Sequence, residues 1–302
     1  MDLDRVLPEL REPMRRADVR APRWLVRAAV RLMRVPHSEA VEVRTVRAGR
    51  VRLRVYEPRG ERSGAGLLWI HGGGLLFGDA KQDEALCTST AERVGVTIVS
   101  ANYRFAPEHP FPAAHDDVRA AWRWLVDNAG SLRIDPDRLA VGGESAGAGL
   151  AAGLVQRVHD EGGVQPRAQW LFAPMLDDRT AARRELDAEQ HPVWSNTANL
   201  EGWSGWLGTA PGGPSAPPYA VPARRADLAG LPPAFVTWGD VELFADEDRA
   251  YSESLVRAGV PVTTDVVAGA PHGFENWAHD TPVAQALVAR AQGWLREATA
   301  PR

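Results

Sequence analysis

The feature that most constrains this chain is an apolar run that passes through a glycine-rich turn into a helix of small residues. It reads RLAVGGESAGAGLAAGLVQRV from Arg138, and residues 143–147, GESAG, match the pattern G-x-S-x-G. Glycines on both sides of Ser145 allow a tight turn from strand to helix, which leaves the serine hydroxyl exposed at the turn. A phosphate-binding turn is the alternative, but neither G-x-x-x-x-G-K-[ST] nor G-x-G-x-x-G occurs in the chain.

The rest of the chain alternates buried strands with helices. Two stretches of alternating apolar and polar residues, VEVRTV and VRLRVYEP, flank RAGR and predict an antiparallel hairpin. Apolar runs typical of buried strands follow: GLLWI, VTIVSANY, RLAVGG, QWLFAP, PAFVTWG and PVTTDVVAG. Helices are predicted at about 80–94, 112–128, 146–159, 245–258 and 281–297. This alternation predicts a mostly parallel sheet with helices on both faces, and the hairpin brings the number of strands to eight.

Residues 177–230 interrupt the alternation with a long excursion that is rich in proline and glycine towards its end. An excursion of this length inside an α/β domain is more often functional than idle. It contains Trp194, Trp203 and Trp206. These tryptophans either wall an apolar pocket or pack a small helical insert, and the sequence leaves both interpretations open.

Near the N-terminus, RWLVRAAVRLMR (residues 23–34) has helical periodicity. One face of the expected helix carries Trp24, Leu25, Ala28, Leu32 and Met33. We favour a helix packed over the body of the protein, and a basic helix resting on a membrane surface is the alternative.

Composition excludes several classes of protein. The 302 residues are 44% hydrophobic and 25% charged, and the net charge of −4 gives no general attraction to nucleic acid. The single cysteine, Cys87, excludes an internal disulfide framework and fits a reducing compartment, so we expect a cytoplasmic protein without a structural zinc site. No apolar run reaches the about 18 residues that a membrane span requires. The acidic N-terminal start also lacks the apolar core of a secretory signal.

A serine hydroxyl is a weak nucleophile unless a base removes its proton. Of the eight histidines, His272 lies in a loop just after the last predicted strand, which gives the chain order serine, acid, histidine. His279 is the second candidate, although it lies where the last helix is about to begin.

Acyl transfer through a serine creates an oxyanion, which needs N–H groups already directed at it. HGGG at residues 71–74 follows a predicted strand, and glycines there let the backbone approach a substrate closely. Gly73, Gly74 and Ala146, the residue after the serine, are the candidate donors. We expect His71 to anchor the loop by hydrogen bonding.

Five segments in order resemble the hormone-sensitive-lipase-like carboxylesterases of the α/β-hydrolase superfamily, also called bacterial family IV esterases. They are HGGG, ANYRFAPEHPFPAAHDD, GGESAGAGLAA, GLPPAFVTWGD and PHGF. The resemblance covers about residues 40–300. It implies an α/β-hydrolase fold with one antiparallel strand in the sheet, in a single domain, 1–302. It also implies a helical cap over the site, drawn from about residues 1–40 and 177–230.

The resemblance further implies hydrolysis of short-chain carboxylic esters through an acyl-enzyme, without cofactor or metal. Ser145 would be the nucleophile and His272 the base. The sequence departs from the family at Glu144, where an aspartate is usual, and at the acid. Glu242 falls on the acid position, which is commonly aspartate, and the nearby Asp240 is the alternative. Because glutamate also serves in triads on this fold, we predict Glu242, with Asp240 binding nearby backbone N–H groups.

Other functions remain open at this stage. An amidase, an arylformamidase or a carbamate hydrolase would use the same three residues. A non-catalytic ligand-binding protein on this fold and a lipase acting at a lipid interface are less favoured. We expect a small-molecule ester as the substrate, neither nucleic acid nor stable membrane insertion, and we consider a homodimer.

Overall fold

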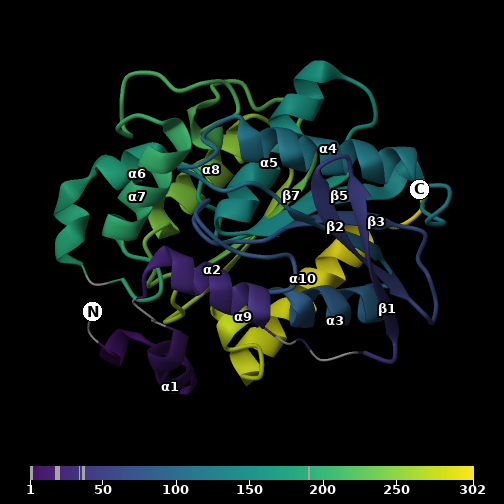
Figure 1. Ribbon diagram of the computed structural model, residues 1–302, viewed down its shortest axis with the longest axis horizontal. Coiled ribbons are helices and arrows are strands. Elements are labelled where there is room, and N and C mark those ends of the chain that lie inside the picture. The colour runs from purple at the N-terminus through teal and green to yellow at the C-terminus, as the bar shows by residue number, and fades with distance from the viewer. Residues whose placement is uncertain (1–2, 18–20, 34, 36–37, 190) are drawn as a thin grey trace.

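The computed structural model describes residues 3–17, 21–33, 35, 38–189 and 191–302. Across these residues, eight strands form one sheet in the order β1-β2-β4-β3-β5-β6-β7-β8 (Figure 1). Their bounds are β1 Val41–Ala48, β2 Val51–Pro58, β3 Gly66–Ile70, β4 Thr97–Asn102, β5 Leu139–Glu144, β6 Ala168–Phe172, β7 Ala234–Gly239 and β8 Val262–Val267. β2 runs antiparallel to β1 and β4, and every other pairing is parallel. The predicted fold class is therefore confirmed.

Helices cover both faces of the sheet, as the alternation predicts. The long ones are α3 Glu84–Val94, α4 Ala113–Asp127, α5 Ala146–Glu161, α8 Ala245–Arg257 and α10 Pro282–Ala298. α3 and α10 pack against each other on one face, and α4 and α5 pack together on the other (Figure 1). Each lies within four residues of its expected bounds, because the period of the apolar residues is long and regular.

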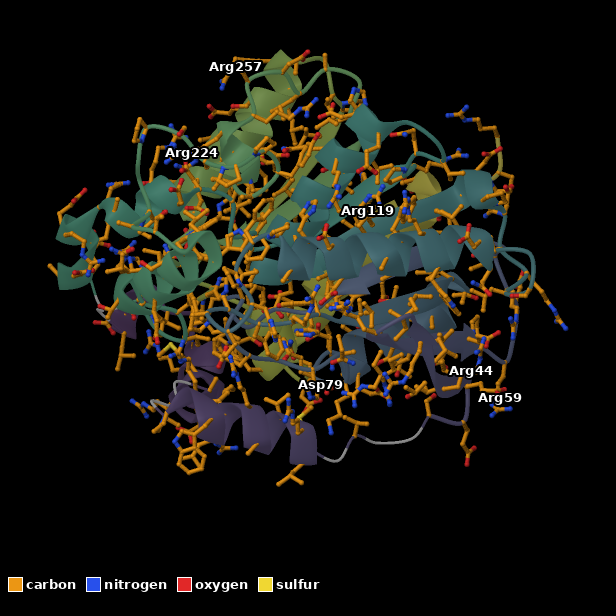
Figure 2. The ribbon with its side chains drawn as sticks, turned by 45° about the horizontal axis from the view of Figure 1, so that its top comes forward. Arg44, Arg59, Asp79, Arg119, Arg224 and Arg257 are labelled. Carbon is orange, nitrogen blue, oxygen red and sulfur yellow. The ribbon has the colours of Figure 1, made fainter. Side chains whose placement is uncertain are left out.

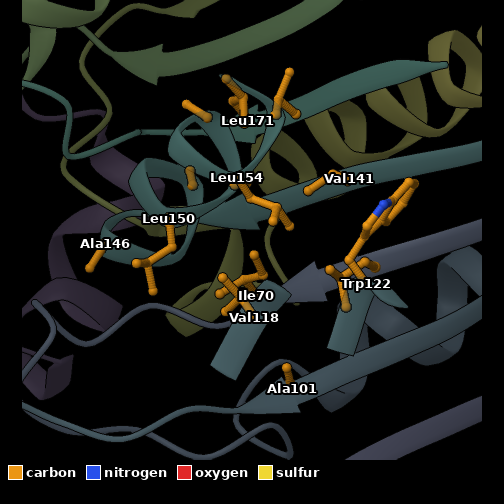
Figure 3. Close-up of a cluster of buried hydrophobic side chains, with 14 of the residues drawn as sticks. Ile70, Ala101, Val118, Trp122, Val141, Ala146, Leu150, Leu154 and Leu171 are labelled. Atoms are coloured by element: carbon orange, nitrogen blue, oxygen red, sulfur yellow. The ribbon is translucent and has the colours of Figure 1, made fainter. Parts of the chain in front are cut away.

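The core between the sheet and the face that carries α4 and α5 holds the central strands in place. Leu150 and Leu154 of α5 belong to one buried cluster with Ile70, Val141 and Leu171 of three neighbouring strands (Figure 3). Burying one such aliphatic side chain contributes about 1.5–3 kcal/mol. Packing of this kind fixes the junction of β5 and α5 rigidly.

Two short elements were not predicted from the sequence. α1 (Pro8–Ala17) has Pro13 inside it and only two buried side chains, Leu10 and Met14. α9 (Phe274–Trp277) has four residues, too few for a periodic pattern. The two helices pack together, with Phe274 in the same apolar cluster as Leu10 and Met14.

The N-terminal amphipathic helix forms as α2 (Arg23–Leu32), but its apolar face is turned outward. All five residues of that face are exposed, and Trp24 keeps 68% of its surface accessible. The helix contacts the body through polar groups. The Arg27 guanidinium donates to the carbonyls of Leu76 (2.8 Å) and Ala106 (3.2 Å) and pairs with Glu108. Arg23 also pairs with Glu201 at 3.2 Å, and Lys81 donates to the Arg31 carbonyl. Packing over the body is thus achieved by charge-assisted hydrogen bonds. Arg34, at the end of the predicted segment, lies outside the described residues.

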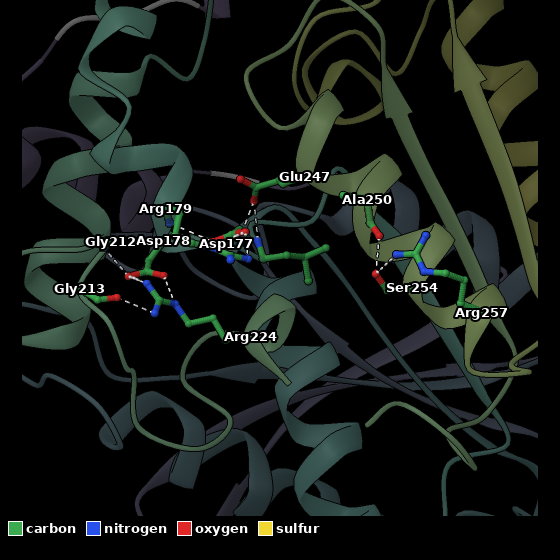
Figure 4. Close-up of polar contacts among 11 residues, drawn as sticks. Asp177, Asp178, Arg179, Gly212, Gly213, Arg224, Glu247, Ala250, Ser254 and Arg257 are labelled. Atoms are coloured by element: carbon green, nitrogen blue, oxygen red, sulfur yellow. Dashed lines mark hydrogen bonds and ion pairs between the residues drawn. The ribbon is translucent and has the colours of Figure 1, made fainter. Parts of the chain in front are cut away.

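The excursion between β6 and β7 folds into α6 (Asp178–Ala182) and α7 (Asn196–Leu207), with short 3-10 turns at Arg184–Ala188 and Pro222–Arg224. A buried ion pair closes it (Figure 4). Asp178 accepts hydrogen bonds from Arg224 Nε (2.6 Å) and from the backbone N–H of Gly212 (2.7 Å), while Arg224 also donates to the carbonyl of Gly213. The segment is therefore an ordered part of the molecule.

Charged side chains are distributed over the surface visible in Figure 2, with Arg44 near the β1–β2 hairpin and Arg257 at the end of α8. Many pair with nearby carboxylates, as Arg44 does with Glu57 at 2.8 Å and Arg119 with Glu161 at 2.6 Å.

Among the helices that the structure describes, none combines the length and the apolar character needed to cross a membrane.

Candidate active site

Ser145 occupies a strained turn between β5 and α5. Its backbone angles are φ 55° and ψ −122°, a region that costs a non-glycine residue on the order of 1–3 kcal/mol. The turn is held because Ser145 N–H donates to the Phe172 carbonyl at 2.8 Å, and the Ser145 carbonyl accepts from the N–H groups of Gly149 and Met175 at 3.0 Å. The surrounding backbone therefore fixes the position of the serine side chain.

The glycines flanking the serine are required by close backbone contacts. A Cβ atom on Gly147 would lie 2.0 Å from the carbonyl oxygen of Ile70, and one on Gly143 would lie 2.6 Å from the same oxygen. The end of β3 and the start of α5 thus approach as closely as the backbone allows. This contact explains the G-x-S-x-G spacing in this chain.

His272 reaches the serine from the loop after β8. Its Nε2 lies 2.8 Å from Ser145 Oγ. The Trp277 indole N–H donates to the His272 carbonyl at 2.8 Å, and the ring of Phe244 packs edge-on against the imidazole. The imidazole is 4% exposed and is held on several sides.

Glu242 completes the group by contacting the other ring nitrogen. Its Oε2 forms a short hydrogen bond with His272 Nδ1, and its Oε1 accepts from the Gly239 N–H at 3.2 Å. Asp240 points elsewhere: it is exposed and accepts from the Gly269 N–H at 2.7 Å. The structure brings Ser145, His272 and Glu242 together and leaves Asp240 outside the group.

The electrostatics distinguish the site histidine from another buried one. Burial alone would lower the pKa of His272, but the adjacent Glu242 carboxylate outweighs it and raises the pKa above the usual 6.5. Burial lowers the pKa of His71 to about 4, so that ring is neutral. His71 Nδ1 lies 2.8 Å from the Gly72 carbonyl, and its ring stacks on Tyr103. His279, the second candidate base, is half exposed and pairs with Asp280.

The loop after β3 contains two glycines in the left-handed region, Gly73 (φ 112°) and Gly74 (φ 59°). A Cβ atom on Gly73 would lie 2.0 Å from the carbonyl oxygen of Phe77. In the part of the chain that the structure describes, the backbone N–H groups of Gly73, Gly74 and Ala146 donate to no protein acceptor. Gly74 and Ala146 are buried residues and Gly73 is half-buried, and N–H groups without an acceptor in such surroundings are uncommon and call for a partner.

The sequence left two roles open for the tryptophans of residues 177–230: lining a pocket or packing the insert. The structure gives them different surroundings. The ring of Trp194 covers the glycine loop so closely that a Cβ atom on Gly74 would lie 1.9 Å from it. Trp206 is core packing, because its indole N–H donates to the Ala220 carbonyl and its ring packs on Phe111. Trp203 is fully buried. Trp194 is thus placed against the glycine loop, and Gly202, next to Trp203, also approaches it, because a Cβ atom there would lie 2.7 Å from the Gly74 carbonyl oxygen.

The Glu144 carboxyl group contacts a set of polar residues. The sequence did not single these residues out. Asn276 donates to Glu144 Oε2 at 3.2 Å and to Asp83 Oδ1 at 2.6 Å, and Trp69 Nε1 donates to Asp83 Oδ2 at 2.7 Å. Glu275 is buried beside them. Asp83 and Asn276 lie 193 positions apart, so no local motif could have joined them.

A serine, an imidazole and a carboxylate at the ends of parallel strands, in the chain order serine, acid, histidine, form the arrangement that defines α/β-hydrolases. A family model described as alpha/beta hydrolase fold matches residues 67–276. The chain belongs to the α/β-hydrolase family, in its hormone-sensitive-lipase-like branch, as the sequence resemblance predicted.

Individual relatives agree with this assignment. "Esterase LipI" of Mycobacterium tuberculosis is 32% identical over 253 residues, which covers 82% of this chain and 78% of that protein. A solved structure named "Bacterial Heroin Esterase" superposes with a TM-score of 0.91 at 32% identity, covering 100% of both chains. An esterase "from the bacterial hormone-sensitive lipase (HSL) family" has a TM-score of 0.84 at 28% identity, covering 97% of this chain and 99% of that one.

Proposed function

We propose that the protein is a carboxylesterase that hydrolyses short-chain esters through an acyl-enzyme on Ser145. The observation that carries the proposal is the contact of His272 Nε2 with Ser145 Oγ at 2.8 Å, combined with Glu242 on the opposite ring nitrogen. The three relatives reported above are each named as an esterase, which supports the same reaction class.

In the first half-reaction, Ser145 Oγ attacks the ester carbonyl while His272 Nε2 accepts the hydroxyl proton. Glu242 holds the Nδ1–H tautomer and stabilises the imidazolium. Collapse of the tetrahedral intermediate breaks the carbon–oxygen bond to the alcohol, which leaves with the proton from His272. In the second half-reaction, His272 activates a water molecule that attacks the acyl-enzyme, and the carboxylic acid is released.

The N–H groups of Gly73, Gly74 and Ala146 are the proposed oxyanion donors. Their lack of protein acceptors among the described residues supports this role. Loss of one such donor typically costs about 10²- to 10³-fold in kcat. The left-handed backbone at Gly73 and Gly74 matters here because it is the conformation that residues with a Cβ atom adopt at a cost.

We further propose that residues from about 1–40 and 177–230 cap the site within a single domain. Trp194 lies against the glycine loop. Arg27 of α2 donates a hydrogen bond to the carbonyl of Leu76, two residues after that loop. Ser145 is only 4% exposed, which favours a small acyl group. Each methylene that the pocket accommodates contributes at most about 0.8 kcal/mol, and a closed pocket turns further length into a clash.

Labelling with a fluorophosphonate, followed by peptide mapping, tests the nucleophile. The probe should modify Ser145 stoichiometrically, and Ser145→Ala should abolish labelling and most ester hydrolysis. A residual rate of roughly 10³-fold over water is still expected in that variant. Labelling that persists in Ser145→Ala would refute the proposal.

A panel of p-nitrophenyl esters from acetate to palmitate, run beside an arylamide and a formanilide, tests the substrate class. Acetyl to hexanoyl esters should be turned over fastest. Faster turnover of the amide or the formanilide would reassign the enzyme to amide hydrolysis. Faster turnover of emulsified long-chain triglyceride would reassign it to lipid interfaces.

The surroundings in which the enzyme acts are part of the same proposal. A lone buried thiol, Cys87, fits a cytoplasmic location, and fractionation of the native host tests it. Light scattering after size-exclusion chromatography tests whether the chain forms a homodimer. A nucleic-acid or stable membrane-bound fraction is not expected.

A further inference from the structure

The side chain of Glu144 lies between the two loops that carry the reacting groups. A Cβ atom on Gly72, in the glycine loop, would lie 3.1 Å from Glu144 Oε2. A Cβ atom on Gly273, in the histidine loop, would lie 2.6 Å from Glu144 Oε1. Both glycines therefore lie close to this carboxyl group, and a Cβ atom would be tight at Gly72 and would clash at Gly273 unless the carboxyl group moved.

The carboxyl group is itself fixed from behind. Asn276 of α9 donates to Oε2 at 3.2 Å and links it to Asp83, which is held by the indole N–H of Trp69 on β3. The Glu144 side chain is thus anchored through one partner, Asn276 of the helix after the histidine loop, and Asn276 connects it to the sheet through Asp83 and Trp69. Glu144 is also the last residue of β5, so its backbone is part of the sheet.

The two contacted glycines are next to the reacting groups along the chain. Gly273 follows His272 directly, and Gly72 precedes Gly73, a proposed oxyanion donor. A change in the length of residue 144 would therefore move the imidazole and the N–H donors relative to Ser145 Oγ. Misplacing reacting groups by about 1 Å can cost on the order of 10²-fold in rate.

We propose that Glu144 is a positioning residue, whose carboxyl group spaces the glycine loop from the histidine loop and thereby sets His272 and Gly73 relative to Ser145. This inference rests on the proposed role of Ser145. It assigns a task to the residue at which this chain departs from the aspartate usual in its family. In this chain the two loops are spaced by a side chain that is one methylene longer than aspartate.

The length of the side chain is the property that sets the spacing. Burial, with the neighbouring carboxyls of Asp83 and Glu275, raises the pKa of Glu144 well above its usual value. Glutamine therefore keeps both the length of the side chain and an oxygen that can accept from Asn276. Aspartate withdraws the carboxyl group by roughly one carbon–carbon bond, about 1.5 Å.

The test compares Glu144→Gln, Glu144→Asp and Glu144→Ala, with kcat expressed per fluorophosphonate-labelled site. Glu144→Gln should stay within about 3-fold of wild type, while the two shorter variants should lose about 10- to 100-fold in kcat with KM changed less than about 2-fold. Expressing kcat per labelled site removes the contribution of unfolded protein.

Glu57→Ala is the matched control. It removes a largely buried carboxylate on β2 that pairs with Arg44 (2.8 Å) and Arg62 (3.1 Å), beside the start of β4 and so at the opposite end of the strands from both loops. It should lower the melting temperature and leave kcat per labelled site unchanged, which separates positioning from general stability.

Three outcomes would overturn the inference. Wild-type kcat in Glu144→Ala would show that the spacing is unnecessary, and a Glu144→Gln variant as slow as Glu144→Ala would show that charge matters instead. In either case, labelling of Ser145 in the wild-type protein would still support the proposed function. Wild-type protein that takes no label at Ser145 would contradict the proposed function and this inference with it.

Discussion

His272 Nε2 lies 2.8 Å from Ser145 Oγ, although 127 positions separate the two residues along the chain. The serine follows β5 and the histidine follows β8, with β6 and β7 between them in the sheet. The loop after β8 must therefore run back across the ends of two strands. Its course depends on the contacts of Trp277 and Phe244 with His272.

The identity of the acid can be tested by exchanging each carboxylate for its amide. Glu242→Gln should reduce kcat by on the order of 10²- to 10⁴-fold, because the amide favours the wrong imidazole tautomer. Asp240→Asn should lose much less, since Asp240 bonds only the backbone N–H of Gly269. Steady-state kinetics on both variants, each with an intact circular dichroism spectrum, would decide. The opposite ranking would transfer the role to Asp240.

The pH dependence of kcat/KM should report His272. The reaction needs the neutral imidazole, so kcat/KM should fall as the pH drops below the pKa of His272, which lies above 6.5. Because Glu242 raises that pKa against the effect of burial, Glu242→Gln should move the acid limb to lower pH. An acid limb that stays in place in Glu242→Gln would contradict the assigned contact.

Trp194 and Gly74 should be coupled. Gly74→Ala places a Cβ atom 1.9 Å from the Trp194 ring and imposes φ 59° on a non-glycine residue. We expect a loss of about 10²-fold or more in kcat, typical of a damaged oxyanion site. The double variant Gly74→Ala/Trp194→Ala should recover part of it, because the clash is removed and only the backbone strain remains.

Gly130→Ala is the control for that pair, since a Cβ atom there would meet nothing within 4 Å. It should leave kcat unchanged. If the double variant is no faster than Gly74→Ala, the ring of Trp194 does not lie over the glycine loop in solution.

The ion pair that closes residues 177–230 should matter for stability far more than surface pairs do. Asp178→Ala leaves Arg224 with a partly buried, unpaired charge and should lower the free energy of unfolding by about 2–4 kcal/mol, somewhat less than a fully buried pair would. Asp246→Ala breaks an exposed pair with Arg249 and should cost less than about 0.5 kcal/mol. Chemical denaturation measures both; equal effects would contradict the burial of Asp178.

Glu247 should make stability fall as the pH rises. Burial raises its pKa to about 8 from 4.5, so between these values the folded state holds a proton that the unfolded state releases. The carboxyl group accepts from the N–H groups of Leu176 and Asp177 (Figure 4). Stability should decline by on the order of 1 kcal/mol per pH unit in this window. Glu247→Gln should reduce the slope by this contribution. Part of the slope should remain, because other buried carboxyls also have raised pKa values: Glu144, Asp248 and Glu275. The exposed Glu253→Gln should leave the slope unchanged.

Much of the architecture could be predicted because its signals are local. The apolar runs, the turn at Ser145 and the HGGG segment each encode an element within a few residues, and their order along the chain predicted the sheet. The orientation of α2 could not be predicted, because its apolar face suggested burial while Arg27 found three acceptors on distant loops. Long-range polar contacts of this kind leave no periodic trace.

The candidate site also combines residues that local signals predict with residues that only long-range contacts bring together. Ser145 and His272 follow from their places at the ends of strands, and the structure puts them in contact. The choice of Glu242 over Asp240 rested on register with the family, and its catalytic role stays a prediction. The set around Asp83 and Asn276 could not be foreseen, since it joins segments 193 positions apart.

α2 is attached by polar contacts, and this affects how the molecule fluctuates. The free energy of a local unfolding event depends on the apolar area it exposes, and Trp24, Leu25 and Leu32 are already in solvent. Detaching α2 breaks the bonds of Arg27, the Arg23–Glu201 ion pair and the bond from Lys81 to the Arg31 carbonyl, and salt screens these charged contacts. We therefore expect the amide hydrogens of α2 to exchange with solvent well before those of α5, and faster at high ionic strength. Each such detachment would leave the carbonyls of Leu76 and Ala106 without the Arg27 guanidinium as their hydrogen-bond donor.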